Sequence, residues 1–138
     1  MNYLSINQLK FAGLFFILTI FLNAGITVLL NLEEFTLVWA LALLYGIPVF
    51  IIGWIFGKKD NETLPLAITG FKFHLITYII VNGVLLSKHF LGLASNYEKI
   101  ETVYQTIIFW GLGLLLHFTI YLFKKGKTIR GIKQSEIF

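Results

Sequence analysis

The chain has 138 residues, of which 57% are hydrophobic and 13% are charged, with a net charge of +4 and no cysteine. Soluble domains carry about a quarter of charged residues, and a chain this short has too little interior to bury so many apolar side chains in water. The composition therefore excludes an ordinary soluble domain and predicts a membrane protein. The lack of cysteine excludes disulfides, thiolate metal sites and cysteine nucleophiles.

Four apolar segments follow one another along the chain, at roughly residues 11–30, 36–56, 72–93 and 103–123. Each has about 20 residues, the length at which an α-helix crosses the hydrocarbon core of a bilayer. In hydrocarbon every backbone amide needs a partner within its own segment, so these segments are predicted to be helices. The first segment is too long for the core of a signal peptide, and we expect it to be retained as a span.

The links between the segments are short, which makes successive helices antiparallel neighbours. The predicted fold class is an all-α membrane protein with four transmembrane helices, an up-down-up-down bundle made of two similar helical hairpins. We expect one membrane domain over residues 1–138, with hairpins at 11–56 and 72–123 and a basic cytoplasmic tail at 124–138. The tail either continues the fourth helix or lies along the lipid headgroups.

Basic residues are distributed unequally between the two ends of the predicted bundle. The end that holds both termini and the second link carries nine of the eleven Lys and Arg residues, and the other end carries Lys88 and Lys99. The positive-inside rule therefore predicts a multi-pass protein of the inner (plasma) membrane with cytoplasmic N- and C-termini. Because these cations flank apolar segments, we expect their partner to be the lipid bilayer and not nucleic acid.

The second and fourth segments resemble each other. Residues 39–46, with the sequence WALALLYG, align without a gap with residues 110–117, with the sequence WGLGLLLH. The first and third segments match more weakly. This pattern suggests a tandem duplication of one hairpin, with the copies related by an axis along the membrane normal. Chance similarity between two Leu-rich helices is the alternative.

Two motifs stand in the second half of the chain. The third segment carries His74-Leu75 and then Asn82, and the fourth carries a Trp-Gly-Leu-Gly-Leu run that begins at Trp110 and leads to His117. Over about residues 71–133 this pattern resembles the bacterial two-transmembrane (2TM) domain family. The first half of the chain lacks both histidines. The resemblance implies a fold of membrane helices and a membrane location, and it implies no reaction.

Polar residues and a glycine recur every fourth position in the third and fourth segments, which places each set on one face of its helix. The sets are His74, Tyr78 and Asn82, and Gly113, His117 and Tyr121. With a rise of about 1.5 Å per residue, an antiparallel hairpin would pair them in layers, His74 with Tyr121, Tyr78 with His117, and Asn82 with Gly113.

We expect these layers to hydrogen-bond across the hairpin and fix its register. One alternative is a site that binds or senses a ligand or a proton through His117. Another is a haem held by the two histidines, although we expect no cofactor and no metal.

The first segment has a polar stripe of its own at Thr19, Asn23 and Thr27, again four residues apart. It is interpreted either as a helix contact or as the lining of a pore in an oligomer. In the second segment Gly46 and Pro48 predict a kink, because proline removes a backbone hydrogen bond, and this kink is a candidate hinge.

The sequence contains no motif of a known catalytic site. It carries no nucleotide-binding loop, zinc-protease helix or nucleophile elbow, and no acidic residue lies within an apolar segment. We expect a non-enzymatic multi-pass membrane module that acts by helix–helix association in sensing or signalling, as a homo-oligomer or with a membrane signalling partner. The alternatives are a small pore-forming or membrane-perturbing effector and a small transporter with parallel repeats.

Overall fold

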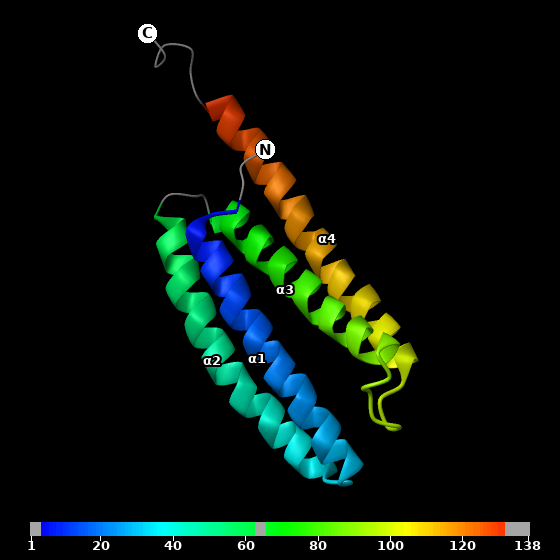
Figure 1. Ribbon diagram of the computed structural model, residues 1–138. Coiled ribbons are helices and arrows are strands. Elements are labelled where there is room, and N and C mark those ends of the chain that lie inside the picture. The colour runs from blue at the N-terminus through cyan, green and yellow to red at the C-terminus, as the bar shows by residue number, and fades with distance from the viewer. Residues whose placement is uncertain (1–3, 63–65, 132–138) are drawn as a thin grey trace.

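The computed structural model describes residues 4–62 and 66–131. Its helices, shown in Figure 1, are α1 (Ile6–Asn31), α2 (Phe35–Asn61), α3 (Leu66–Phe90) and α4 (Ile100–Gly131). All four are long and apolar enough to cross a membrane, and the described residues contain no strand. The prediction of an all-α membrane protein with four spans is confirmed.

Except at the end of α3, the helices extend beyond the predicted segments. The first helix begins in a capping box, in which the Ser5 hydroxyl accepts from the backbone N–H of Gln8 at 3.0 Å and the Gln8 side chain accepts from the Ser5 N–H at 3.1 Å. Helix α2 continues past residue 56 to Asn61. The tight α1–α2 turn is closed by Glu33, whose φ of 60° is left-handed.

The described part of the basic tail continues the fourth helix, which is the first of the two predicted alternatives. Helix α4 continues without interruption through Gly131, so residues 124–131 extend the fourth helix. The remainder of the predicted tail, residues 132–138, lies outside the described residues.

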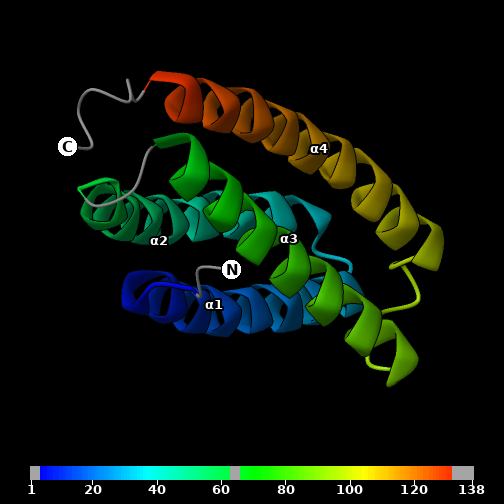
Figure 2. The ribbon, with the colours of Figure 1, turned by 90° about the horizontal axis from the view of Figure 1, so that it is seen from above.

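The helices form two antiparallel hairpins that meet along α1 and α3 (Figure 1). We call the end of the bundle that holds the start of α1 and the end of α4 the terminal side, and the opposite end the loop side. Figure 2 shows α3 lying between the α1–α2 pair and α4. Among the described helices, α4 contacts α3 alone. The bundle is therefore open along α4.

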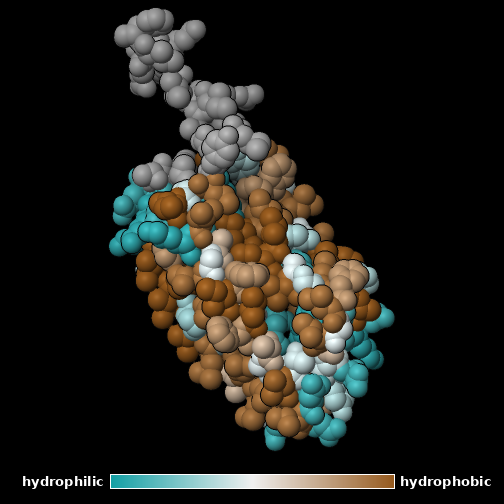
Figure 3. Space-filling model, viewed as in Figure 1, coloured by the Kyte–Doolittle hydropathy of each residue, from teal (hydrophilic) through white to brown (hydrophobic). Residues whose placement is uncertain are grey.

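The apolar core lies in the half of the bundle towards the terminal side, where α1, α2 and α3 converge. Its buried members are Phe11, Phe15 and Ile76, with Phe73 against Phe11 at a ring-centroid distance of 4.7 Å. Most other large apolar side chains are exposed along the helices, and Figure 3 shows the resulting hydrophobic surface, in brown. Hydrocarbon is the solvent in which such a surface is stable, since water would penalise it.

Helix α2 runs through Pro48 as one continuous helix. A Cβ atom added at Gly46 would meet nothing within 4 Å, whereas one added at Gly25 of α1 would lie 2.7 Å from the Leu41 Cδ2 atom. Gly25 therefore marks a close approach of α1 to α2, and Gly46 does not. The hinge at Gly46 and Pro48 stays a prediction.

Candidate functional site

The two histidines of the second hairpin lie against each other. The His74 ring of α3 stacks on the His117 ring of α4, with centroids 4.7 Å apart and planes 12° apart. The Trp110 ring meets His74 edge-on at 6.3 Å. A Cβ atom added at Gly113 would lie 3.7 Å from the His74 Nε2 atom, so this glycine lies directly against the imidazole.

The predicted layers are wrong by about one helical turn. Tyr121 stacks on Phe71, with centroids 5.5 Å apart, and not beside His74. The Tyr78 hydroxyl donates to the backbone carbonyl of Ile107 at 3.3 Å and lies beside Gly111. Gly113, which was predicted to lie opposite Asn82, lies beside His74. At the loop side α3 ends at Phe90 and α4 begins at Ile100, each about three residues earlier than predicted, so the residues at equal depth differ from those predicted.

Some polar atoms of this hairpin have no hydrogen-bond partner among the described residues. Within the described residues, the buried His74 Nε2 and Asn82 Oδ1 atoms form no hydrogen bond, although the Asn82 amide donates to the Tyr78 carbonyl at 2.8 Å. His117 is exposed, and its Nδ1 atom lies 3.0 Å from the Gly113 carbonyl. A carbonyl only accepts, so Nδ1 carries the hydrogen and Nε2 of His117 is a bare acceptor.

The stacked histidines are not arranged as two axial haem ligands are. Two axial ligands must aim a nitrogen at one iron from opposite sides, whereas these rings lie face to face with their centroids 4.7 Å apart. In the described part of the chain, no group of three or more His, Cys, Asp or Glu residues is placed to hold a metal ion.

The polar stripe of α1 is directed at the other helices of the same chain. The Thr19 hydroxyl donates to the Phe15 carbonyl at 2.7 Å and lies 3.0 Å from the Tyr45 hydroxyl of α2. The Asn23 amide donates to the Thr19 carbonyl at 2.9 Å, and the Thr27 hydroxyl lies 3.1 Å from a carboxylate oxygen of Glu98. Of the two interpretations of the stripe, this geometry favours the helix contact over the pore lining.

A buried ion pair joins the hairpins at the loop side. Lys88 of α3 is 7% exposed, pairs with Glu98 of the α3–α4 loop, and reaches across to the Asn23 carbonyl of α1 at 3.4 Å. The Glu98 carboxylate also accepts from Thr27 at 3.1 Å and from the Ser95 backbone N–H at 2.8 Å. Sequence reasoning used Lys88 only as a marker of orientation. Its position inside an apolar segment, ten residues from an acid, was the signal that could have found the pair.

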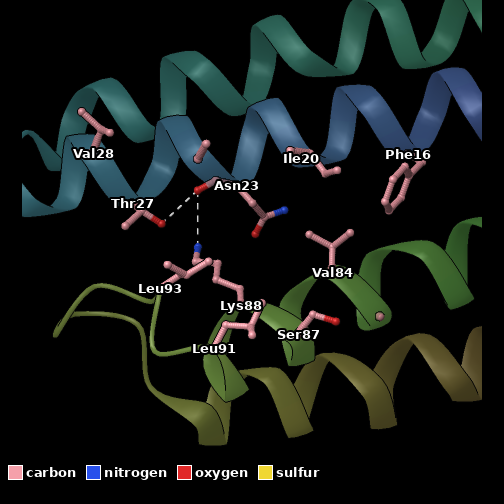
Figure 4. Close-up of a pocket in the computed structure, with 12 residues that line it drawn as sticks. Phe16, Ile20, Asn23, Thr27, Val28, Val84, Ser87, Lys88, Leu91 and Leu93 are labelled. Carbon is pink, nitrogen blue, oxygen red and sulfur yellow. Dashed lines mark hydrogen bonds between the residues drawn. The ribbon is translucent and has the colours of Figure 1, made fainter.

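A pocket of about 540 Å³ lies beside this ion pair, where α1 and α3 diverge towards the loop side. Figure 4 shows its two walls, with Phe16 and Ile20 on α1 across from Val84 and Lys88 on α3. The walls are largely apolar, and the polar groups gather near the loop side.

A second buried acid lies at the terminal side. Asp60, which was expected in a loop, belongs to the last turn of α2 and is 1% exposed. Its carboxylate accepts from the Ser5 hydroxyl at 2.8 and 2.9 Å, from the Asn7 amide at 3.0 Å and from the Gln8 amide at 2.6 Å. These contacts tie the start of α1 to the end of α2. The polar run Ser5–Gln8 ahead of the first apolar segment was the available signal for this cluster.

Four apolar helices with their polar clusters near the ends define a multi-pass α-helical membrane protein. The 2TM domain family matches residues 66–134, half of the chain. The chain belongs to this family, as its second-half motifs predicted. No curated protein and no solved structure matches the chain. The family match covers α3 and α4, and therefore the His74–His117 stack, whereas the duplication of the hairpin stays a prediction.

Proposed function

We propose that the chain is a non-enzymatic membrane module that works by self-association, with α4 of one copy lying against α4 of a second. The proposal rests on the contacts of α4 and on the exposure of one of its side chains. This helix contacts only α3 among the described helices, and it exposes the imidazole of His117 within a membrane span.

An exposed imidazole is costly in hydrocarbon unless another polar group meets it. Polar side chains in transmembrane helices usually face a bundle interior and hydrogen-bond across helices. His117 uses Nδ1 for the Gly113 carbonyl, so its Nε2 acceptor needs a donor that the described part of the chain does not provide. The partner of α4 must therefore present a hydrogen-bond donor at that depth.

A second copy satisfies this requirement. A two-fold axis along the membrane normal makes the two α4 helices parallel and places both His117 rings at the same depth. When one ring carries hydrogens on both nitrogens, its Nε2–H donates to the bare Nε2 of the other. The group that faces His117 from α3 is His74, which stacks on it.

The same proposal places the module in the inner (plasma) membrane with both termini in the cytoplasm. Its support is the excess of Lys and Arg at the terminal side over the loop side. The terminal side is then the cytoplasmic surface, and α4 carries its basic continuation there.

Cysteine crosslinking tests the interface, because the natural chain has no cysteine. Ile120 lies on the free side of α4 next to His117, and Leu122 lies on the opposite flank. Both side chains are 50% exposed, so they are matched. In membranes treated with an oxidant at one fixed pH, Ile120→Cys should give a disulfide-linked dimer several-fold more readily than Leu122→Cys.

His117→Leu in the Ile120→Cys chain should remove most of that dimer while the helical circular dichroism is unchanged. Equal crosslinking at positions 120 and 122, or a dimer that survives His117→Leu, would show that α4 does not pair through this imidazole. A chain that stays monomeric in bilayers would overturn self-association altogether.

A further inference from the structure

The pocket lies between α1 and α3, where the two hairpins meet, and it is separate from the free face of α4. Its apolar walls come from Phe16, Ile20 and Val28 on α1 and from Val84, Leu91 and Leu93 on the α3 side. From Phe16 to Val28 the helix rises about 18 Å at about 1.5 Å per residue. Half of a hydrocarbon core is about 15 Å, so the pocket runs through one leaflet, the one on the loop side.

The lining of the pocket limits what suits it. Its walls are almost wholly apolar, and its volume is about 540 Å³. Such a lining suits an apolar chain that lies along α1 and α3.

The loop-side half of the pocket carries a cation. A lysine ammonium has three N–H donors, and Lys88 uses one for Glu98 and one for the Asn23 carbonyl. Figure 4 shows this ammonium directed from α3 towards the Asn23 carbonyl of α1. The third donor is left for an anionic oxygen that enters the pocket from the same leaflet.

We infer that this pocket binds a phospholipid of the loop-side leaflet, with one acyl chain between α1 and α3 and a phosphate oxygen on the Lys88 ammonium. The apolar walls, the length of one leaflet and the buried Lys88 ammonium in the loop-side half match the order of groups along a lipid. The Lys88–Glu98 pair has no net charge, so it suits a zwitterionic headgroup, whose ammonium lies near Glu98 while its phosphate meets Lys88.

Native mass spectrometry of the full chain in detergent tests this site. The delipidated protein is titrated with phosphatidylethanolamine, with a fatty alcohol of the same chain length and with inorganic phosphate. We expect one phosphatidylethanolamine to be retained at concentrations about tenfold lower than the alcohol needs, which corresponds to about 1.4 kcal/mol for the phosphate contact. Equal binding of the alcohol, or binding of free phosphate alone, would overturn the assignment.

Two matched alanine variants place the lipid in the pocket. Ala24 lines it, and Ala40 is exposed on α2 outside it. Ala24→Phe fills the groove and leaves the Lys88–Glu98 pair in place, so it should weaken phosphatidylethanolamine binding at least tenfold, while Ala40→Phe should not change it. Identical binding by the two variants would show that lipid is held elsewhere on the helices. Crosslinking at Ile120→Cys reports on self-association independently.

Discussion

Replacing Asp60 by alanine should loosen the terminal side of the α1–α2 hairpin. This carboxylate is 1% exposed and accepts hydrogen bonds from three side chains at the start of α1. It also lies close to the N-terminus of that helix, where a negative charge is favoured by the helix dipole. The alanine variant removes the acceptor and leaves its donors behind.

The size of the effect follows from how deeply each donor is buried. Gln8 is 0% exposed, so its amide would lose a charge-assisted hydrogen bond, worth about 1.5–3 kcal/mol, without replacement by water. Ser5 and Asn7 are only partly buried, and water can replace most of their bonds, which leaves about 0.5 kcal/mol each. Asp60→Ala should therefore lower the free energy of unfolding by about 3 kcal/mol.

Asp60→Asn removes the negative charge and keeps the shape of the side chain. The amide keeps one oxygen acceptor, but its NH₂ group faces donors that cannot all turn away. Gln8 cannot flip without breaking the capping box that it forms with Ser5. We expect this variant to lose about 1–2 kcal/mol, less than the alanine variant does.

Unfolding by sodium dodecyl sulfate in mixed micelles, followed by tryptophan fluorescence and circular dichroism, measures both changes. Glu62→Ala is the matched control, since this exposed carboxylate lies two residues further along the chain and its loss should stay within about 0.5 kcal/mol. If Asp60→Ala is no more destabilising than Glu62→Ala, the carboxylate does not hold α1 against α2 and the reasoning fails.

Two further predictions concern single contacts. In a double-mutant cycle, His74→Leu and His117→Leu should show a coupling of about 0.5–1 kcal/mol from the stacked rings, and additive effects would exclude the stack. At the loop side, the hydrogen bond to Glu33, and then its negative charge, raise the pKa of Tyr97 above its ordinary value. This contact stabilises the fold below pH 10 or so and is lost as the pH rises through the raised pKa. In ultraviolet titration with Tyr97→Phe as the reference, Glu33→Gln should lower that pKa, and an unchanged value would contradict the contact.

The interior of the second hairpin shows why register was harder to predict than helix position. The spacing of His74 and Tyr78 correctly placed both side chains on the face of α3 that meets α4. A slide of one turn keeps the same faces together, so periodicity alone does not distinguish His117 opposite Tyr78 from His117 opposite His74. The lengths of the helices and the fold of the loop between them decide it.

The ion pair of Lys88 and the cluster around Asp60 were missed for a related reason. Both residues lie near the ends of apolar segments, where a charged side chain is normally interpreted as an interfacial residue. Each is buried only because a second helix brings acceptors or donors to it, Asn23 of α1 for Lys88 and the start of α1 for Asp60. Such contacts join residues more than 50 positions apart, which local patterns do not report.

The sequence by itself determined that four helices cross a bilayer and where each one lies, because length and hydrophobicity set the cost of leaving water one segment at a time. Its second-half motifs also determined the family. The tertiary structure decided which faces meet, that α4 is left open and that α1 and α3 part to form a pocket. In hydrocarbon an apolar side chain gains little from facing a helix instead of a lipid tail, so close packing and a few hydrogen bonds choose the neighbours.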